Sequence, residues 1–134
     1  MRLEIADATI EASEHVNAAS TSQTVPIFEL PPAAFVIAFG ARVTTAFAGV
    51  TGPNVQVGVS GETDKYMRQQ SIGSTGDLIA GWAPNAMTYC EAMTAGGRVG
   101  TEANRSIIAT FGSSSGNLSS LSAGVVKFYL IYAV

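Results

Sequence analysis

The chain has 134 residues, of which 47% are hydrophobic and only 13% are charged, and its formal net charge is -3. A chain of this length forms one domain with its own core, and its high hydrophobic and low charged content excludes intrinsic disorder. Ten acidic residues against seven basic ones argue against a nucleic-acid partner, because phosphate binding requires a clustered basic excess.

Cys90 is the only cysteine, which excludes an intrachain disulfide and a metal site built from several cysteines. Residues 1–4 alternate apolar and charged side chains, unlike a signal peptide. The longest apolar run, 33–41, is much shorter than the roughly 20 residues that cross a bilayer. We therefore expect no membrane partner and synthesis in the cytoplasm.

The low share of charged residues indicates which residue types form the surface. Mean hydropathy is +0.28 without a long apolar segment, so Ser, Thr, Gly, Asn, Gln and Ala must form most of the surface. A solitary soluble protein usually carries more charge, whereas the centres of subunit interfaces are depleted in charge. Two interpretations follow: a small β domain with a neutral polar surface, and a subunit largely covered by other subunits. The composition favours the second.

The N-terminal third predicts short extended segments. Leu3 and Ile5 suit an edge strand, with Ile10 as a further candidate. Residues 11–23 are small and polar and predict a mobile arm or loop. Residues 24–30 are extended, and Pro26 assigns them to a sheet edge because proline lacks an N–H. We therefore divide the chain into an N-terminal arm or edge segment, 1–23, and a β-sandwich domain, 24–134.

The middle of the chain has the clearest period of two. Apolar side chains alternate over 35–47, which predicts one long strand with Phe35, Ile37 and Phe39 facing the core and a bend at Gly40. Val55, Val57 and Val59 alternate with polar or small residues in a second strand, 54–60. A turn at 49–53 separates the two strands, so we predict that they form a β-hairpin.

Further short strands are expected toward the C-terminus, and the segment 61–65 is expected to be a turn. The strands are predicted near 66–67, with a single helical turn as the alternative, at 87–93, with a short helix as the alternative, and at 78–82, 106–111 and 125–132. The Ser- and Gly-rich segment 112–124 predicts a loop in which Leu118 and Leu121 fold back onto the core. Short strands at about ten-residue spacing, without a long helical period, predict an all-β fold: a single antiparallel domain, a β-sandwich or a barrel, with a polar N-terminal arm.

The last predicted strand, 125–132, is apolar on both faces. One face of an antiparallel sandwich sheet normally contacts water, so Tyr129 and Ile131 require cover on the outer face. The cover could come from the N-terminal arm or the rim of the domain, or from another subunit. Both alternatives stay open from the sequence.

The residues do not predict an active site, a cofactor or a metal ion. Residues 112–116 fit the G-x-S-x-G pattern of a hydrolase nucleophile, but no helix is predicted after them and the only histidine, His15, comes before them. His15 and Cys90 lack a local context that would pair them for catalysis. Trp82, with Asp77 nearby in sequence, is the only local indication of a sugar-binding platform, which makes a carbohydrate-binding module one alternative.

Two parts of the chain resemble small virion proteins of tailed bacteriophages. The resemblance lies in strand-and-turn patterns that cover about half of the chain, at 29–37, 40–47, 53–58, 107–111, 116–118 and 124–132. It implies a β-sandwich or jelly-roll structural protein, such as a head decoration (cement) protein, and such proteins are often trimers. The pattern transfers no active-site residues.

The predicted function is therefore that of a non-enzymatic virion protein, made in the host cytoplasm and located on the capsid surface. It would bind the major capsid protein as a homo-oligomer, expected to be a trimer; a phage tail or spike component is a second alternative. The predicted interface residues are Tyr129, Ile131, Glu11, Glu14 and Val16. If residues 1–23 form an arm, deleting them should leave the sandwich folded and weaken only assembly.

Overall fold

A computed structural model describes residues 2–32, 34–78 and 106–134. The described chain is nearly all β, as predicted, and its helical segments α1 and η3 are four and three residues long. The elements are β1 (Leu3–Glu11), α1 (Ala12–His15), β2 (Ser22–Glu29), β3 (Phe35–Ala48), β4 (Asn54–Val59), β5 (Glu62–Ser71), β6 (Gly76–Leu78), β7 (Ser106–Gly112), η3 (Leu118–Ser120) and β8 (Ala123–Ala133).

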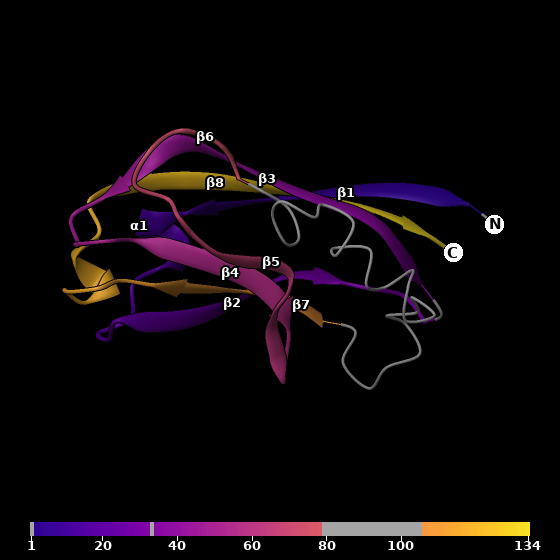
Figure 1. Cartoon of the computed structure of the whole chain (residues 1–134), viewed down its shortest axis with the longest axis horizontal. Helices are drawn as coiled ribbons and strands as arrows, with labels where there is room; N and C mark the ends of the chain where they lie inside the picture. The colour runs from indigo at the N-terminus through magenta and orange to yellow at the C-terminus, as the bar shows by residue number, and fades with distance from the viewer. Residues whose placement is uncertain (1, 33, 79–105) are drawn as a thin grey trace.

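The eight described strands form two four-stranded antiparallel sheets, which lie one above the other in Figure 1. One sheet has the order β1-β8-β3-β6 and the other the order β2-β7-β4-β5; we call them the β1 sheet and the β2 sheet. The first strand pairs with the last, the second with the seventh, the third with the sixth and the fourth with the fifth. This pairing order is that of a long hairpin folded over on itself, the jelly-roll form of a β-sandwich.

Aromatic side chains from both sheets fill the space between the layers. The rings of Phe47 on β3 and Phe111 on β7 are 5.9 Å apart across the sandwich, and those of Phe39 and Tyr66 are 6.4 Å apart. The valines of β4, at positions 55, 57 and 59, are at most 3% exposed, which confirms the face predicted for this strand. Burial of these side chains is the main favourable contribution to folding.

β3 is less regular than its sequence pattern predicts. The register between β3 and β8 shifts between Val36 and Ala38 and again between Val43 and Thr45. Each shift inserts an extra residue and changes which side chains face inward. Phe39 is buried as predicted, but Val36 is buried in place of Ile37, which is half-exposed. The prediction for Ile37 is therefore wrong, because a strict period of two assumes a strand without bulges.

The predicted hairpin between 35–47 and 54–60 is also wrong, because β3 and β4 belong to different sheets. The segment 49–53 carries the chain from one layer to the other. Thr51 pairs with Ser115 in an isolated bridge, and Gly49 has a φ of 107°. A Cβ atom on Gly49 would collide with the carbonyl oxygen of Ser120, so this corner requires glycine for both its conformation and its close packing.

Much of the N-terminal segment belongs to the sandwich, in which β1 is an edge strand, as predicted for Leu3 and Ile5. β1 pairs with β8 along its whole length, from Leu3 to Glu11. α1 follows directly, and Ala12 and Val16 are only 2% and 1% exposed within the core. Residues 11–16 therefore do not form the expected loop, because Ala12 and Val16 are buried in the core between the sheets.

The remaining strands follow the sequence closely, except at β5. β7 and β8 match the predicted strands, and Leu118 is 1% exposed while Leu121 packs against the core, as expected. The predicted turn at 61–65 is shorter than expected, since β5 begins at Glu62. β6 ends at Leu78, so residues 79–82 of the strand predicted at 78–82, and the whole segment 87–93, lie outside the described residues.

Candidate interaction surface

The outer face of the β1 sheet exposes most of the large apolar side chains that reach solvent in the described part of the chain. Ile5 is 77% exposed, Leu3 60% and Tyr129 40%. Leu3 and Ile5 alternate with half-buried residues of β1 that point toward the core. Side chains of this size are seldom grouped on the surface of a protein that acts alone.

The register of the strands places these residues side by side. Ile5 on β1 lies opposite Ile131 on β8, and Asp7 lies opposite Tyr129. Directly opposite residues in antiparallel strands point to the same face, with Cβ atoms about 5 Å apart. Leu3, Ile5, Ile131 and Tyr129 therefore form a continuous area across two strands, which we call the apolar patch.

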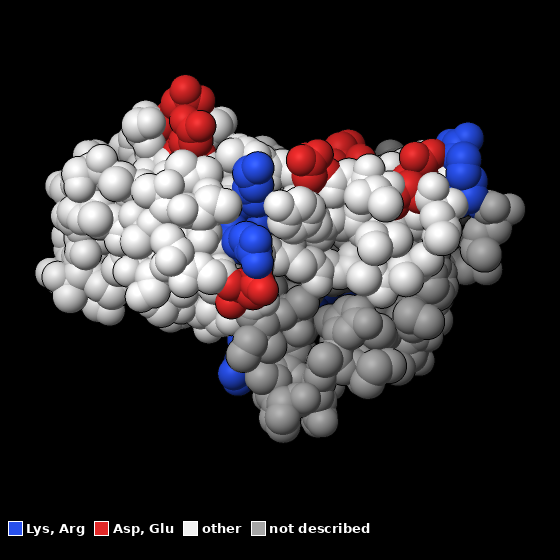
Figure 2. Space-filling model, turned by 90° about the horizontal axis from the view of Figure 1, so that it is seen from above, with Lys and Arg blue, Asp and Glu red and all other residues white. Residues whose placement is uncertain are grey.

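A row of charged residues borders the apolar patch. Lys127 on β8 lies opposite Arg42 on β3, and Arg42 lies opposite Asp77 on β6. Arg42 Nε donates a hydrogen bond of 2.7 Å to Asp77 Oδ1. This bond and the opposite charges lower the pKa of Asp77 and raise the pKa of Arg42. Figure 2, which looks onto this face, shows a few charged clusters separated by wide uncharged areas.

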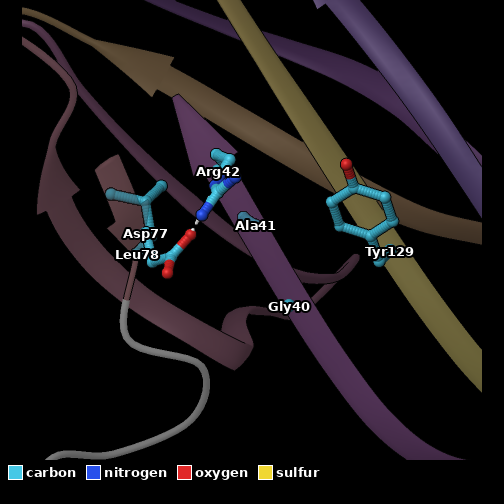
Figure 3. Close-up of a pocket in the computed structure, with 6 residues that line it drawn as sticks. All are labelled: Gly40, Ala41, Arg42, Asp77, Leu78 and Tyr129. Atoms are coloured by element: carbon cyan, nitrogen blue, oxygen red, sulfur yellow. Dashed lines mark hydrogen bonds and ion pairs between the residues drawn. The ribbon is translucent and has the colours of Figure 1, made fainter. Parts of the chain in front are cut away.

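A shallow depression of about 390 Å³ lies between this row and the apolar patch. The absence of a side chain at Gly40 opens it: a Cβ atom there would have no heavy atom within 4 Å. Figure 3 shows Tyr129 on one side of β3 and the Arg42–Asp77 pair on the other. The depression offers an aromatic ring and an already paired guanidinium, which suits contact with another surface better than bond-making chemistry.

The outer face of the β2 sheet has a different character. A second depression, of about 380 Å³, is lined mainly by uncharged hydroxyl and amide groups from β2, β4, β5 and β7 and the turn after β7. Thr24 and Thr110 lie opposite each other there, and Gln56 donates a 2.6 Å hydrogen bond to Thr63. The lining residues are Ser22, Asn54, Gln56, Gln69, Thr110, Phe111, Gly112, Ser113 and Ser114.

The predicted interface residues fall in three places. Tyr129 and Ile131 lie together in the apolar patch. Glu11 is the half-buried last residue of β1, and Glu14 is exposed on α1. Val16 is 1% exposed and belongs to the core of this chain, so its side chain is not available to a partner without local unfolding.

Among the described residues, the candidate catalytic side chains are not brought together. His15 Nδ1 accepts a 3.1 Å hydrogen bond from the backbone N–H of Glu11 in the adjacent turn. Gly112 ends β7, and the backbone of the next residues bonds to Thr51 and Thr21 without starting an α-helix. Cys90 and Trp82 lie outside the described residues. Within 2–32, 34–78 and 106–134, no three His, Cys, Asp or Glu residues are grouped as metal ligands.

Sequence reasoning missed Leu3 and Ile5 as surface residues, although the signal was present. In a regular strand, odd-numbered and even-numbered residues point to opposite faces. Leu3 and Ile5 therefore lie on the face opposite to Ile10. The Arg42–Asp77 pair had no such signal, because its members are 35 positions apart. Among the described residues, no helix is long and apolar enough to cross a membrane.

Comparison with known proteins identifies a likeness in structure. No protein-family model matches the chain, and no curated protein matches its sequence. Among solved structures, the chain is similar to a chain of the "Cyanophage Pam1 capsid asymmetric unit", with a TM-score of 0.55 and 15% sequence identity. The match covers 97% of this chain and 83% of the other. At this identity, the likeness shows that the two chains share a fold.

Proposed function

We propose that this chain is a structural protein of a phage particle. It binds the outer surface of the capsid as a homo-oligomer, expected to be a trimer, and acts as a decoration protein that stabilises the shell. The observation that carries this proposal is the likeness over nearly the whole chain to a component of a phage capsid unit. The jelly-roll topology supports it, because viral capsid domains are among the proteins that use this fold.

The surface of the β1 sheet supports the oligomeric part of the proposal. The apolar patch leaves two side chains more than half exposed, and only 13% of the residues are charged. Burying the patch against another subunit would gain about 25 cal/mol per Å² of apolar surface removed from water. The proposal also includes the absence of catalysis, since the side chains lining both described depressions suit contact rather than acid–base chemistry.

The alternatives predict different locations or ligands. A tail or spike component would have the same fold and the same need for a covered face, so only its position on the particle distinguishes it. The interpretation as a carbohydrate-binding module was based on Trp82 and Asp77. Trp82 lies outside the described residues, and Asp77 accepts a hydrogen bond from Arg42. No further observation favours sugar binding.

The test combines mass, binding and position. Light scattering should give the mass of an oligomer, and the purified protein should sediment with capsid shells of the phage that encodes it. Cryo-electron microscopy of the intact particle should then show its density on the outer face of the head. A protein that stays monomeric at high concentration and does not bind these shells would overturn the proposal, whereas density on the tail would support the tail component instead.

A further inference from the structure

The four edge strands of the described sandwich differ in how they are protected against pairing with another chain. β2 contains Pro26 and a register shift. β5 has four charged side chains and two register shifts, and β6 has only three residues. Proline, bulges, charges and short length are the usual means of blocking an edge. β1 has nine residues that pair with β8 without a register shift, and it contains no proline; its only charged side chains are three carboxylates.

The hydrogen bonds at the chain ends show which backbone groups of β1 face this open edge. Arg2 N–H donates to the Val134 carbonyl at 2.8 Å, and Val134 N–H donates to the Arg2 carbonyl at 2.9 Å. Such bonded pairs alternate with non-bonded pairs along antiparallel strands. The even-numbered residues of β1 therefore bond to β8, whereas Leu3, Ile5, Asp7 and Thr9 direct their N–H and C=O groups away from it. No strand in the described residues pairs with that side.

The charge on β1 indicates what kind of strand fits this edge. Between Leu3 and Glu11 the strand has three carboxylates, at Glu4, Asp7 and Glu11, and no basic residue. Arg2, just before it, pairs with Glu4 at 2.6 Å. Pairing β1 with β1 of a second copy would bring two acidic strands together, and like charges across a strand pair are destabilising. A basic strand has the complementary charge.

We propose that β1 receives an extended, basic segment of a partner protein as a fifth strand of the β1 sheet. The backbone of the segment bonds to Leu3, Ile5, Asp7 and Thr9. Its apolar side chains lie beside Leu3 and Ile5, extending the apolar patch, and its lysines or arginines lie near Asp7 and Glu11. This is recognition by strand addition, in which backbone bonds give affinity and side chains give specificity. The inference rests on the proposed function only in taking the partner to be another protein of the particle.

The first experiment measures amide hydrogen exchange by NMR in the full chain. The probe is a peptide of about ten residues in which valine and lysine alternate, with a control peptide in which glutamate replaces lysine. Without peptide, the amides of Leu3, Ile5, Asp7 and Thr9 should exchange fast while the even-numbered amides of β1 are protected. The lysine peptide should slow the four fast amides, and the glutamate peptide should leave them unchanged.

The second experiment removes one edge donor without touching the bonds to β8. Asp7→Pro lacks the N–H that faces the edge, and Asp7→Ala keeps it, while both variants lose the same charge. Binding of the lysine peptide, followed by fluorescence anisotropy, should be about tenfold weaker for the proline variant than for the alanine variant. Circular dichroism and thermal unfolding verify that both are folded. If the proline variant does not fold, N-methylation of the peptide backbone supplies the same test from the partner's side.

Three results would overturn the proposal: no binding of the lysine peptide at low ionic strength, binding that leaves the four amides fast, or protection of these amides before any peptide is added. Concentration-dependent protection without peptide would assign the edge to a second copy of the chain. The outcome is separable from that of the proposed function. A protein that binds the lysine peptide through β1 but no capsid shell would leave this inference standing and overturn the assignment to the capsid.

Discussion

Gly124 on β8 lies against the ring of Phe47 on β3, so closely that a Cβ atom at position 124 would be 2.5 Å from the ring carbons Cγ and Cδ2. The φ of Gly124 is 147°, in a region that side-chain-bearing residues rarely adopt. The contact lies near the start of β8, where the ring of Phe47 also packs on Phe111 of the β2 sheet. One glycine thus fixes how closely β8 approaches the core at this end.

Replacing Gly124 with alanine should therefore destabilise the domain by about 1–3 kcal/mol, through overpacking and backbone strain. Chemical denaturation monitored by circular dichroism measures the change. Gly40→Ala is the matched control, since a Cβ there meets open space, and its effect should stay within about 0.5 kcal/mol. Similar losses at both positions would contradict the packing described for Phe47.

The register of β4 predicts opposite results at neighbouring positions. Val57 is 0% exposed, so Val57→Asp should destabilise the domain by several kcal/mol, on the order of 3 or more, because it buries an unpaired charge. Gln56 points outward and bonds to Thr63; Gln56→Asp should cost only about 1 kcal/mol, the value of a lost hydrogen bond. Urea titrations compare the two, and equal effects would refute the register.

The apolar patch should be needed for assembly and not for folding. Ile5→Ser and Tyr129→Ser should change the free energy of unfolding by less than about 1 kcal/mol, because both side chains are substantially exposed. Both should lower the oligomer mass in light scattering and reduce binding to capsid shells. Thr24→Ala, on the exposed face of the other sheet, is the control and should assemble normally. Unchanged assembly in both serine variants would exclude the patch as an interface.

The Arg42–Asp77 pair should be visible in the titration of Asp77. Its carboxyl has a pKa below the ordinary value of 3.8, first because of the hydrogen bond from Arg42 and then because of the nearby positive charge. Because the pKa is lowered in the folded state, the pair stabilises the fold at pH values above the unfolded-state pKa of Asp77. This stabilisation is lost as the pH falls through the folded-state pKa. In a titration followed by carbon-13 NMR, the midpoint of the Asp77 carboxyl should return toward 3.8 in Arg42→Gln and also in high salt. A midpoint insensitive to both would contradict the ion pair.

Deleting residues 1–23 should abolish cooperative folding, which is the reverse of the expectation from the sequence. The deletion removes β1 and the core side chains of Ile10, Ala12 and Val16, and it exposes the edge of β8. Thermal unfolding should show no cooperative transition for the truncated chain. A truncated chain that unfolds cooperatively near the full-length midpoint would restore the interpretation of these residues as a dispensable arm.

The strands that the sequence predicts best are those with one face in the core and few irregularities. β7 alternates strictly between half-buried and buried residues, and the inward residues Val57 on β4, Phe111 on β7 and Phe128 on β8 are at most 1% exposed. Hydrophobic alternation determines which face of such a strand points inward, because a slip of one residue would bury polar side chains. The start of β5 was not predicted, because its first four residues are polar. Polar side chains suit an edge strand that is exposed to solvent.

Long-range relationships could not be predicted in the same way. Sequence proximity suggested a hairpin between β3 and β4, whereas β3 pairs with β8 and β6. The pairing depends on how the whole chain closes into two layers, and no local pattern contains that information. The same holds for the surface: Tyr129 and Ile131 were identified from a strand that is apolar on both faces, but their neighbour Ile5 comes from the other end of the chain.

The reciprocal bonds between Arg2 and Val134 have a consequence for the time at which the protein can fold. Among the described strands, β8 is the last in chain order and lies between β1 and β3 in the sheet. Until β8 has been synthesised, β1 has no partner among these strands and β3 has only the three-residue β6. Contacts between such distant parts of a chain make folding slow, typically milliseconds to seconds. Until that point, both edges of β1 lack a strand partner among the described strands. The sandwich is therefore completed only once β8 is available to pair with both strands, and any assembly built from it begins after that step.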